Sequence, residues 1–291
     1  MLHIPKMMDP AEYKKEWEAG LHQTEYNACR FAEDKVAFGE QWFKKYGPWI
    51  DFKNPKNAVD RIAHYKLYDL DPRKPMWADK ICSHWNLYEA GMPELAIEPV
   101  YHSRCYLTDS DWQNIPNGKY ILKMSHGSGW NMKFEKTDTF NPDYLQQKVY
   151  EWYNLNFAYL SGWEWQYDKI IPGFVIQPDL GHLMNWEFWC EEGEVKALNL
   201  TIKEKKNALR SIAWVGEYST GHQPAREFLS KSEKEVVERM LPYVKKLASD
   251  FKFVRVDLYH INNEIKFSEL TFTPGAGLMR FYEDSSRKFM L

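Results

Sequence analysis

Two acidic residues on either side of a predicted turn, Asp257 and Glu269, have the clearest potential for chemistry in this sequence. In residues 251–261 apolar and polar side chains alternate with the period of a half-buried β-strand, and Asp257 belongs to the polar set. Asn262-Asn263 supplies turn residues, because Asn tolerates positive φ. A second strand follows and carries Glu269. The segment therefore predicts a β-hairpin with one acid on each strand.

The register of this hairpin decides whether the two acids face each other. A two-residue turn at Asn262-Asn263 would place Asp257 and Glu269 on opposite faces, since a one-residue shift turns every side chain over. A three-residue loop, residues 262–264, places all the polar partners on one face, and we predict this register. Its cross-strand pairs are Ile261 with Ile265, Tyr259 with Phe267, Asp257 with Glu269 and Arg255 with Thr271.

Facing carboxylates repel each other across strands, and a bound cation would relieve the repulsion. Oxygen ligands alone suit Mg²⁺. The pattern therefore predicts a magnesium site at Asp257 and Glu269. The alternative is a solvated face on which Arg255 neutralises both acids.

The end of the hairpin carries a resemblance to a known superfamily. Arg255-Val-Asp257, followed by Glu269-Leu-Thr-Phe-Thr-Pro-Gly275, resembles the metal end of ATP-grasp enzymes, where R-x-D precedes E-x-N-x-x-P-G. The combination is most similar to the TupA-like ATP-grasp proteins of bacterial surface-polysaccharide clusters, over roughly residues 75–285. The resemblance implies that Asp257, Glu269 and Thr271 hold Mg²⁺ on the ATP phosphates and that Arg255 steadies the transferring phosphoryl group. Thr271 stands where the superfamily has Asn.

A second segment of interest begins where the apolar strand 120–122 ends at Lys123. The loop that follows is built of small residues, which let backbone N–H groups approach phosphate oxygens, and Lys123 adds a point charge. No Walker A sequence is present, and a plain hairpin turn is the alternative. The resemblance implies that Lys123, also a catalytic residue, binds the ATP phosphates together with Ser125, His126, Gly127, Ser128 and Gly129. His126 could instead cap the loop.

The resemblance assigns further residues around the nucleotide and the substrate. Lys80, in a helix expected to run from Met76 toward Glu89, would reach the phosphates, although a lysine in a first helical turn is usually a solvated residue. The backbone of Gln177, Asp179 and Leu180 would hold the adenine edge, and Glu187 the ribose. Lys203, Arg210 and Gly275 would face the substrate, with a solvated loop as the alternative for the basic residues.

Composition excludes several classes of protein. The 291 residues carry a formal charge of −3 with a pI near 6.3, which argues against a nucleic-acid partner. Mean hydropathy is −0.62, and no apolar run approaches the roughly 18 residues of a membrane span. The N-terminus lacks the apolar core of a signal peptide. Cys29, Cys82, Cys105 and Cys190 lie far apart and fit free thiols in a reducing cytoplasm.

The predicted elements indicate an α+β protein, and the resemblance implies the ATP-grasp fold, in which two α+β subdomains sandwich ATP. We expect a helical N-terminal region over residues 1–75, with helices at 9–20 and 28–47. The first ATP-grasp subdomain would span residues 76–176 and the second 177–291. An amphipathic helix after Ser230 should bury Val236, Met240, Val244 and Leu247.

The function implied is an ATP-dependent carboxylate–amine ligase that forms an amide through an acyl phosphate. ATP and Mg²⁺ would be its cofactors, with a small-molecule or sugar carboxylate and an amine as partners. The resemblance suggests an amino acid or amine joined to a uronic-acid sugar in capsular or cell-surface polysaccharide biosynthesis. The alternatives are an ATP-dependent kinase on the same fold and a nucleotide-sugar glycosyltransferase. For the last we expect the usual D-x-D metal motif to be missing from the chain, which counts against it.

Overall fold

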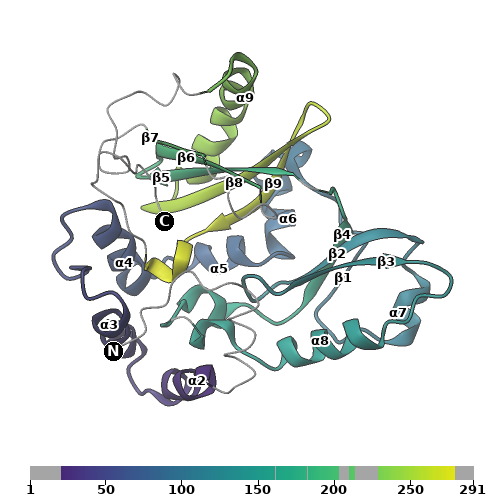
Figure 1. Ribbon diagram of the computed structural model, residues 1–291, viewed down its shortest axis with the longest axis horizontal. Helices are drawn as coiled ribbons and strands as arrows, with labels where there is room; N and C mark the ends of the chain where they lie inside the picture. The colour runs from purple at the N-terminus through teal and green to yellow at the C-terminus, as the bar shows by residue number, and fades with distance from the viewer. Residues whose placement is uncertain (1–20, 161, 182, 203–209, 214–228, 279–291) are drawn as a thin grey trace.

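The computed structural model describes residues 21–160, 162–181, 183–202, 210–213 and 229–278. These residues contain two antiparallel β-sheets (Figure 1). The four-stranded sheet has the order β1-β4-β2-β3, and the five-stranded sheet has the order β7-β6-β5-β8-β9. The strands are β1 (Tyr101–Ser103), β2 (Gly118–Met124), β3 (Asn131–Lys136), β4 (Phe174–Pro178), β5 (Met184–Glu191), β6 (Glu194–Ile202), β7 (Arg210–Ala213), β8 (Phe253–Ile261) and β9 (Glu264–Thr271).

Helices cover the outer faces of both sheets. Figure 1 shows α9 above the five-stranded sheet, α8 below the four-stranded sheet, α5 and α6 between them, and α2, α3 and α4 at one side. The α-helices are α2 (Leu21–Phe31), α3 (Lys35–Tyr46), α4 (Ala58–Tyr68), α5 (Arg73–Ala78), α6 (Cys82–Glu89), α7 (Asp109–Gln113), α8 (Asp143–Tyr153) and α9 (Lys231–Ala248). The 3-10 helices are η1 (Pro93–Leu95), η2 (Phe157–Tyr159), η3 (Trp165–Lys169) and η6 (Pro274–Gly277).

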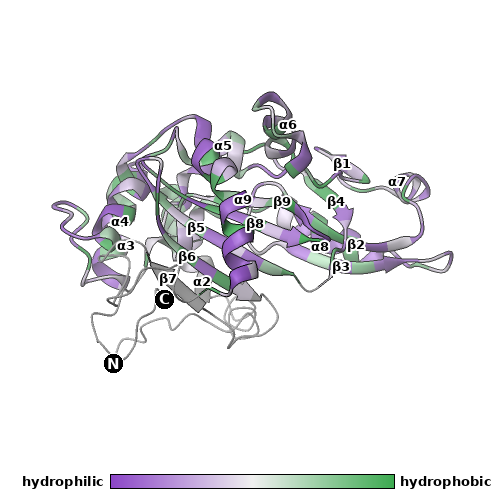
Figure 2. Cartoon of the chain, turned by 90° about the horizontal axis from the view of Figure 1, so that it is seen from above, coloured by the Kyte–Doolittle hydropathy of each residue, from purple (hydrophilic) through white to green (hydrophobic). Residues whose placement is uncertain are grey.

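Helix α9 forms as the sequence predicts and seals one face of the five-stranded sheet. Its N-terminus has a capping box, in which Ser230 and Glu233 bond each other's backbone N–H groups. The predicted apolar face, Val236, Met240, Val244 and Leu247, is buried with the alternate residues of β8. Figure 2 shows the hydrophilic outer side of α9 with the strands behind it. The other face of the sheet is shared between the N-terminal helices and the candidate site.

The four-stranded sheet has a separate core. Leu122 of β2 and Ile176 of β4 are fully buried and pack with Leu145 and Val149 of α8. The two sheets lie in residues 101–178 and 184–271 of the described chain. The boundary between subdomains at residue 176 stays a prediction.

The N-terminal helices pack on the five-stranded sheet. Phe43 of α3 and Ile62 of α4 are buried against Trp189 of β5 and Phe253 of β8. We predicted one helix over residues 28–47, but the helix is interrupted at 32–34, because Asp34 caps α3 by accepting the Ala37 N–H. The predicted helix at 9–20 lies outside the described residues.

The predicted helix from Met76 to Glu89 is also divided, and the division moves Lys80. Helix α5 ends at Ala78 and α6 begins at Cys82. The Asp79 carboxylate accepts the N–H groups of Ile81 and Cys82, at 2.9 and 3.3 Å. This local capping competes with helix continuation. Lys80 therefore lies in the break between two helices instead of within one.

The hairpin of β8 and β9 has a tighter turn than we predicted. Asn262 and Asn263 have φ angles of 48° and 64° and form a two-residue turn that pairs Ile261 with Glu264. Positive φ at both central residues is typical of a type I′ turn, whose twist matches that of the strands. The predicted three-residue loop is wrong.

A β-bulge then restores the predicted meeting of the two acids. The register shifts between Asp257 and Leu258, where Ser268 is an extra residue on β9. Phe267 is opposite Leu258 and not Tyr259, so that predicted pair is wrong, as is the pair of Ile261 with Ile265. The pairs of Asp257 with Glu269 and Arg255 with Thr271 are confirmed.

Among the described residues, no helix combines the length and apolar character that crossing a membrane requires.

Substitution of Asn262 tests the turn. Asn262→Val should lower the free energy of unfolding by about 1–2 kcal/mol, because a β-branched side chain is strained at positive φ. Asn262→Gly should cause no loss. Urea unfolding followed by tryptophan fluorescence measures both. The matched control is Glu264→Val, an exposed strand position expected to change stability by less than about 0.5 kcal/mol. Equal losses at 262 and 264 would contradict the turn assignment.

Candidate functional site

A cavity of about 540 Å³ lies between the two sheets. This volume is in the range of small-molecule and cofactor sites. Its walls come from α6, from β2, β3 and β4 of one sheet, and from β8 and β9 of the other. The lining includes several apolar residues: Leu87, Ile97, Ile121, Leu180 and Leu183.

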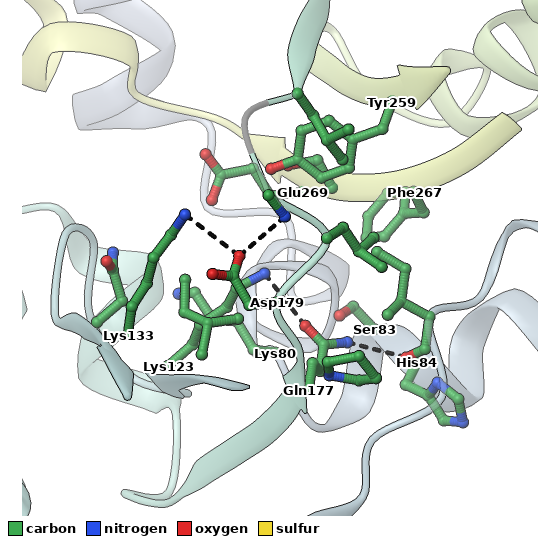
Figure 3. A pocket seen from close by; sticks show the side chains of 18 of the residues that line it. Lys80, Ser83, His84, Lys123, Lys133, Gln177, Asp179, Tyr259, Phe267 and Glu269 are labelled. Atoms are coloured by element: carbon green, nitrogen blue, oxygen red, sulfur yellow. Dashed lines mark hydrogen bonds and ion pairs between the residues drawn. The ribbon is translucent and has the colours of Figure 1, made fainter. Parts of the chain in front are cut away.

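Three lysines of different elements reach the polar side of the cavity (Figure 3): Lys80, Lys123 and Lys133. The Lys80 amine donates to the Gly127 carbonyl oxygen at 2.7 Å, and the Lys123 amine donates to Gln177 Oε1 at 3.1 Å. Converging ammonium groups are suited to bind phosphate oxygens. The predicted residues Lys80 and Lys123, far apart in sequence, are therefore brought together.

Lys133 is a cavity residue that our sequence reasoning missed. It pairs with the Asp179 carboxylate at 3.2 Å, and Asp179 also accepts the Gly181 N–H at 3.0 Å. Asn131, two residues earlier on β3, lines the same cavity. Alternation along β3 could have indicated a shared face, but only the β2–β3 pairing shows which face meets the cavity.

The predicted phosphate loop is divided between cavity and core. Ser128 and Gly129 line the cavity, whereas Ser125 and His126 are buried and do not. Ser125 Oγ donates to the Ile171 carbonyl oxygen at 3.3 Å. The His126 ring lies 3.0 Å from the Trp152 carbonyl oxygen, and burial lowers its pKa. These contacts make His126 a neutral support beneath the loop.

Gly127 gives the loop its tight packing. A Cβ at this position would lie 2.4 Å from the Trp130 ring, which leaves no room for a side chain. The Trp130 ring stacks on Trp152 at 6.2 Å between centroids. The glycine loop is therefore shaped from behind by aromatic residues, and its Ser128–Gly129 end faces the cavity.

The predicted adenine hinge lines the cavity, but Glu187 does not. Gln177, Asp179 and Leu180 are all lining residues. The Gln177 amide is held at both ends, because its nitrogen donates to the Ile97 carbonyl oxygen at 2.9 Å and its oxygen accepts from Lys123. Glu187 lies on β5, directly opposite Asp257.

Three carboxylates form a row across adjacent strands: Glu187 on β5, Asp257 on β8 and Glu269 on β9. Glu269 lines the cavity, whereas Asp257 is fully buried. The Arg255 guanidinium donates to both oxygens of Asp257, at 2.7 and 2.6 Å, and lies 3.6 Å from Glu269. Arg255 thus contacts both acids, as in the alternative to a metal site, but the fully buried Asp257 does not lie on a solvated face.

The row of three carboxylates has more negative charge than the single guanidinium of Arg255 can neutralise. Burial raises the pKa of Asp257 to about 7; Arg255 opposes this rise, and Glu187 and Glu269 add to it. Burial by itself would lower the pKa of Arg255, but Asp257 and Glu187 raise it above its ordinary value. Both pKa values are therefore raised, which favours the charged form of Arg255 and the protonated form of Asp257. For Asp257 the cause is burial, to which the neighbouring acids add.

Asn185 is hydrogen-bonded to two of the acids, Glu187 and Asp257. Its amide nitrogen donates to Glu187 at 3.1 Å and to Asp257 at 3.3 Å, and Thr201 donates to Glu187 at 2.8 Å. The Asn185 amide oxygen is buried and has no hydrogen-bond partner within the described chain. The charge and the unsatisfied oxygen both favour a cation near this row.

The donor set fits Mg²⁺ held in part by a ligand. In the described ranges no group of three or more His, Cys, Asp or Glu side chains is arranged to hold a metal ion. Mg²⁺ in phosphate sites is typically bound by one or two carboxylates together with substrate phosphates and water. Asp257 and Glu269 would be the two carboxylates of such a site, and their role as ligands stays a prediction. The Thr271 hydroxyl accepts from Arg255 at 3.1 Å.

The predicted substrate residues are only partly described. Gly275 lies in η6, after β9, and does not line the cavity. Lys203 lies outside the described residues, and of Arg210 the structure describes only the backbone, in β7. Their roles stay predictions.

Two stacked α+β layers with a lysine-lined cavity between them have the layout of the ATP-grasp fold. The family model described as TupA-like ATPgrasp matches residues 76–290. This match covers well over half of the chain, and the protein therefore belongs to the TupA-like ATP-grasp family. The resemblance and fold inferred from sequence are confirmed.

Several solved structures are similar to this chain. D-alanine–D-alanine ligase from Bacillus anthracis, complexed with ATP, is 14% identical over 68% of this chain and 55% of that one, with a TM-score of 0.38. The Helicobacter pylori D-alanine–D-alanine ligase is 16% identical over 70% and 56%, with a TM-score of 0.39. An L-amino acid ligase from Bacillus licheniformis is 13% identical over 84% and 56%, with a TM-score of 0.46. The chain spans about half the length of these proteins. A comparison with curated proteins gave no match.

The raised pKa of Asp257 predicts a pH dependence of stability without metal. Its folded pKa of about 7 is above the ordinary 3.8, so the folded state retains a proton that the unfolded state loses. Stability should therefore fall as pH rises from about 4 to about 7. Asp257→Asn should reduce the loss between pH 5 and pH 8 by about 2 kcal/mol, measured by urea unfolding at each pH.

The control for this measurement is Glu264→Gln, which removes an exposed carboxylate from the same hairpin. It should leave the wild-type slope unchanged. A wild-type slope in Asp257→Asn would show that Asp257 is an ordinary ionised partner of Arg255.

Proposed function

We propose that the protein is an ATP-dependent carboxylate–amine ligase. A carboxylate oxygen of the substrate forms a bond to the γ-phosphorus of ATP while the bond to ADP breaks, which gives an acyl phosphate. An amine nitrogen then forms the amide bond as phosphate leaves, and the amine gives up a proton. The observation that carries this proposal is the cavity between the sheets, with three lysines on one side and Glu269 of the acidic row on the other.

The lysines would bind the phosphates. Lys80 and Lys123 come from the α5–α6 break and the end of β2, and Lys133 comes from β3. Ser128 and Gly129 can add contacts to the same phosphates from the loop. Fixed cations in a partly enclosed site stabilise the charge that develops during phosphoryl transfer, and little covalent chemistry is required of the protein.

Arg255 would act on the transferring phosphoryl group. The Arg255 side chain is 16% exposed. Its orientation is fixed by the two hydrogen bonds that the guanidinium donates to the Asp257 carboxylate. Asp257 and Glu269 would hold Mg²⁺, which when bound supplies neutralisation of phosphate charge. The apolar residues of the cavity lining, together with the hinge at Gln177 and Leu180, suit a flat base.

The substrate class is inferred from the family. We propose an amino acid or amine joined to a uronic-acid sugar in capsular or cell-surface polysaccharide biosynthesis. The reaction would take place in the cytoplasm, in keeping with the four free cysteines, Cys29, Cys82, Cys105 and Cys190.

The sequence does contain the D-x-D pattern of nucleotide-sugar glycosyltransferases twice, at Asp69-Leu-Asp71 and Asp109-Ser-Asp111. Asp69 is paired with Lys74, Asp71 with Arg73, and Asp111 accepts hydrogen bonds from Thr108 in the cap of α7. These aspartates do not line the cavity. Their structural partners weigh against the glycosyltransferase alternative.

Ligand binding and product analysis test the proposal. Mg²⁺ with ATP should raise the melting temperature of the protein, because a ligand that binds only the folded state stabilises it, whereas UDP-glucose should not. Incubation with Mg-ATP, a panel of amino acids and uronic acids, and hydroxylamine as the amine should release ADP and form a hydroxamate. ADP with a phosphoester would instead identify a kinase. Stabilisation by UDP-glucose alone would overturn the ATP-dependent reading.

Lys123→Ala should weaken binding of ADP with Mg²⁺ by about 10-fold to 100-fold, since hydrogen bonds to charged groups contribute about 1.5–3 kcal/mol. Isothermal titration calorimetry measures the affinity. Lys119→Ala removes an exposed lysine from the same strand and should leave the affinity unchanged. An equal loss of affinity in both variants would mean that Lys123 contributes only to the net charge of the protein and does not contact the phosphates.

A further inference from the structure

A buried lysine of the N-terminal helices, Lys66, touches the loop that follows the acidic hairpin. Lys66 lies on α4, outside the residues matched by the family model, and is 1% exposed. Its amine donates to the Ala276 carbonyl oxygen at 2.7 Å. The same amine lies over the rings of Trp42 and Phe43, 4.2 and 4.9 Å from their centroids. Burial lowers the pKa of this amine to about 7, and the aromatic faces act against that shift by favouring the charged form.

The loop that Lys66 contacts has an unusual backbone. Gly275, Ala276 and Gly277 have φ angles of 57°, 55° and 79°. A left-handed conformation costs about 1–2 kcal/mol for a residue with a side chain, so Ala276 must be held there by its surroundings. The Ala276 and Leu278 N–H groups bond the Thr273 and Gly275 carbonyl oxygens.

The N-terminal helices also fix the loop by close packing. A Cβ on Gly277 would lie 2.9 Å from Phe43 Cζ and 3.4 Å from Lys66 Cδ. At the other end, Gln166 donates to the Thr273 hydroxyl at 2.8 Å, and this hydroxyl donates to Glu164. The loop is thus held from two sides, by α3 and α4 and by the segment around η3.

The position of the loop relates it to the reacting groups. Pro274 begins η6 three residues after Thr271, the cross-strand partner of Arg255. On the same face of the sheet, Arg255 lies over the Trp189 ring at 5.8 Å, and Trp189 packs with Phe43 and Ile62. The N-terminal helices are therefore the elements that pack next to Arg255. Lys66, which belongs to one of these helices, connects them to the loop.

We propose that Lys66 is a positioning residue: it holds the Pro274–Gly277 loop, which contains the predicted substrate residue Gly275, in its left-handed form. The proposal rests on the ligase function proposed above. It makes the N-terminal helical region part of the substrate-binding end, while the nucleotide end is formed by residues of the family-matched region.

The test compares Lys66→Met with Lys74→Met. Lys74 is a matched control, because it is also buried, at 2% exposure, and donates to a main-chain carbonyl oxygen, that of Asp69, at 2.8 Å. With the best carboxylate of the hydroxylamine assay, Lys66→Met should raise the KM for the carboxylate at least 10-fold and leave the KM for ATP within twofold. Lys74→Met should leave the ratio of the two KM values unchanged. Lys66→Arg, which keeps a cationic donor, should recover part of the loss.

Hydrogen–deuterium exchange supplies a readout that needs no substrate. Amides of residues 273–278 should exchange at least 10-fold faster in Lys66→Met than in the wild type or Lys74→Met, and those of β8 should not change. Equal loop exchange in all three proteins, or KM values for ATP and carboxylate that rise together, would overturn the proposal. A wild type that binds no ADP with Mg²⁺ would instead overturn the proposed ligase function.

Discussion

The ion pair of Arg255 and Asp257 is the interaction on which the site depends. It joins two residues of one strand in a two-point contact at 2.6–2.7 Å, at the centre of three carboxylates. Loss of the guanidinium would leave a buried, uncompensated charge, which is among the most destabilising changes in a protein interior. The rest of the sheet face is arranged around this pair, with the cavity toward Glu269 on one side and the N-terminal helices against Trp189 on the other.

The hairpin shows how much local sequence can predict. The pairing of Asp257 with Glu269 was predicted from an assumed loop length, and alternation alone does not give it. Glu269 has the same strand parity as the buried Ile265 and Phe267, and the bulge at Ser268 turns it to the face of Asp257. The path to this pairing was different, because the Asn-Asn turn is tight and Ser268 is an added residue. A polar residue such as Ser268 has no local signature that separates a bulge from an ordinary strand position. Family resemblance provided Lys80 and the hinge, which no local pattern indicates.

The remaining differences arise from tertiary packing. Lys133 could not be assigned to the cavity before the strand order was known, and His126 could not be assigned to the core before its contact with Trp152 was known. Lys66 illustrates the same limit, since a lysine in a helix is expected to be solvated, and its burial depends on Trp42, Phe43 and a loop more than 200 residues away. Propensity and periodicity describe segments, whereas these sites are made by the contacts between them.

Because of the bulge at Ser268, the number of residues in the turn does not by itself determine which residues pair in the acidic row. A hairpin with one more residue in the turn and no Ser268 would pair Asp257 with Glu269 in the same way, since the two changes cancel before the acids are reached. Related chains can therefore exchange one arrangement for the other without any change in the catalytic face. An alignment of such chains would show two compensating one-residue gaps, one at the turn and one at the bulge, and forcing the segment into a single ungapped block would misplace every residue between them.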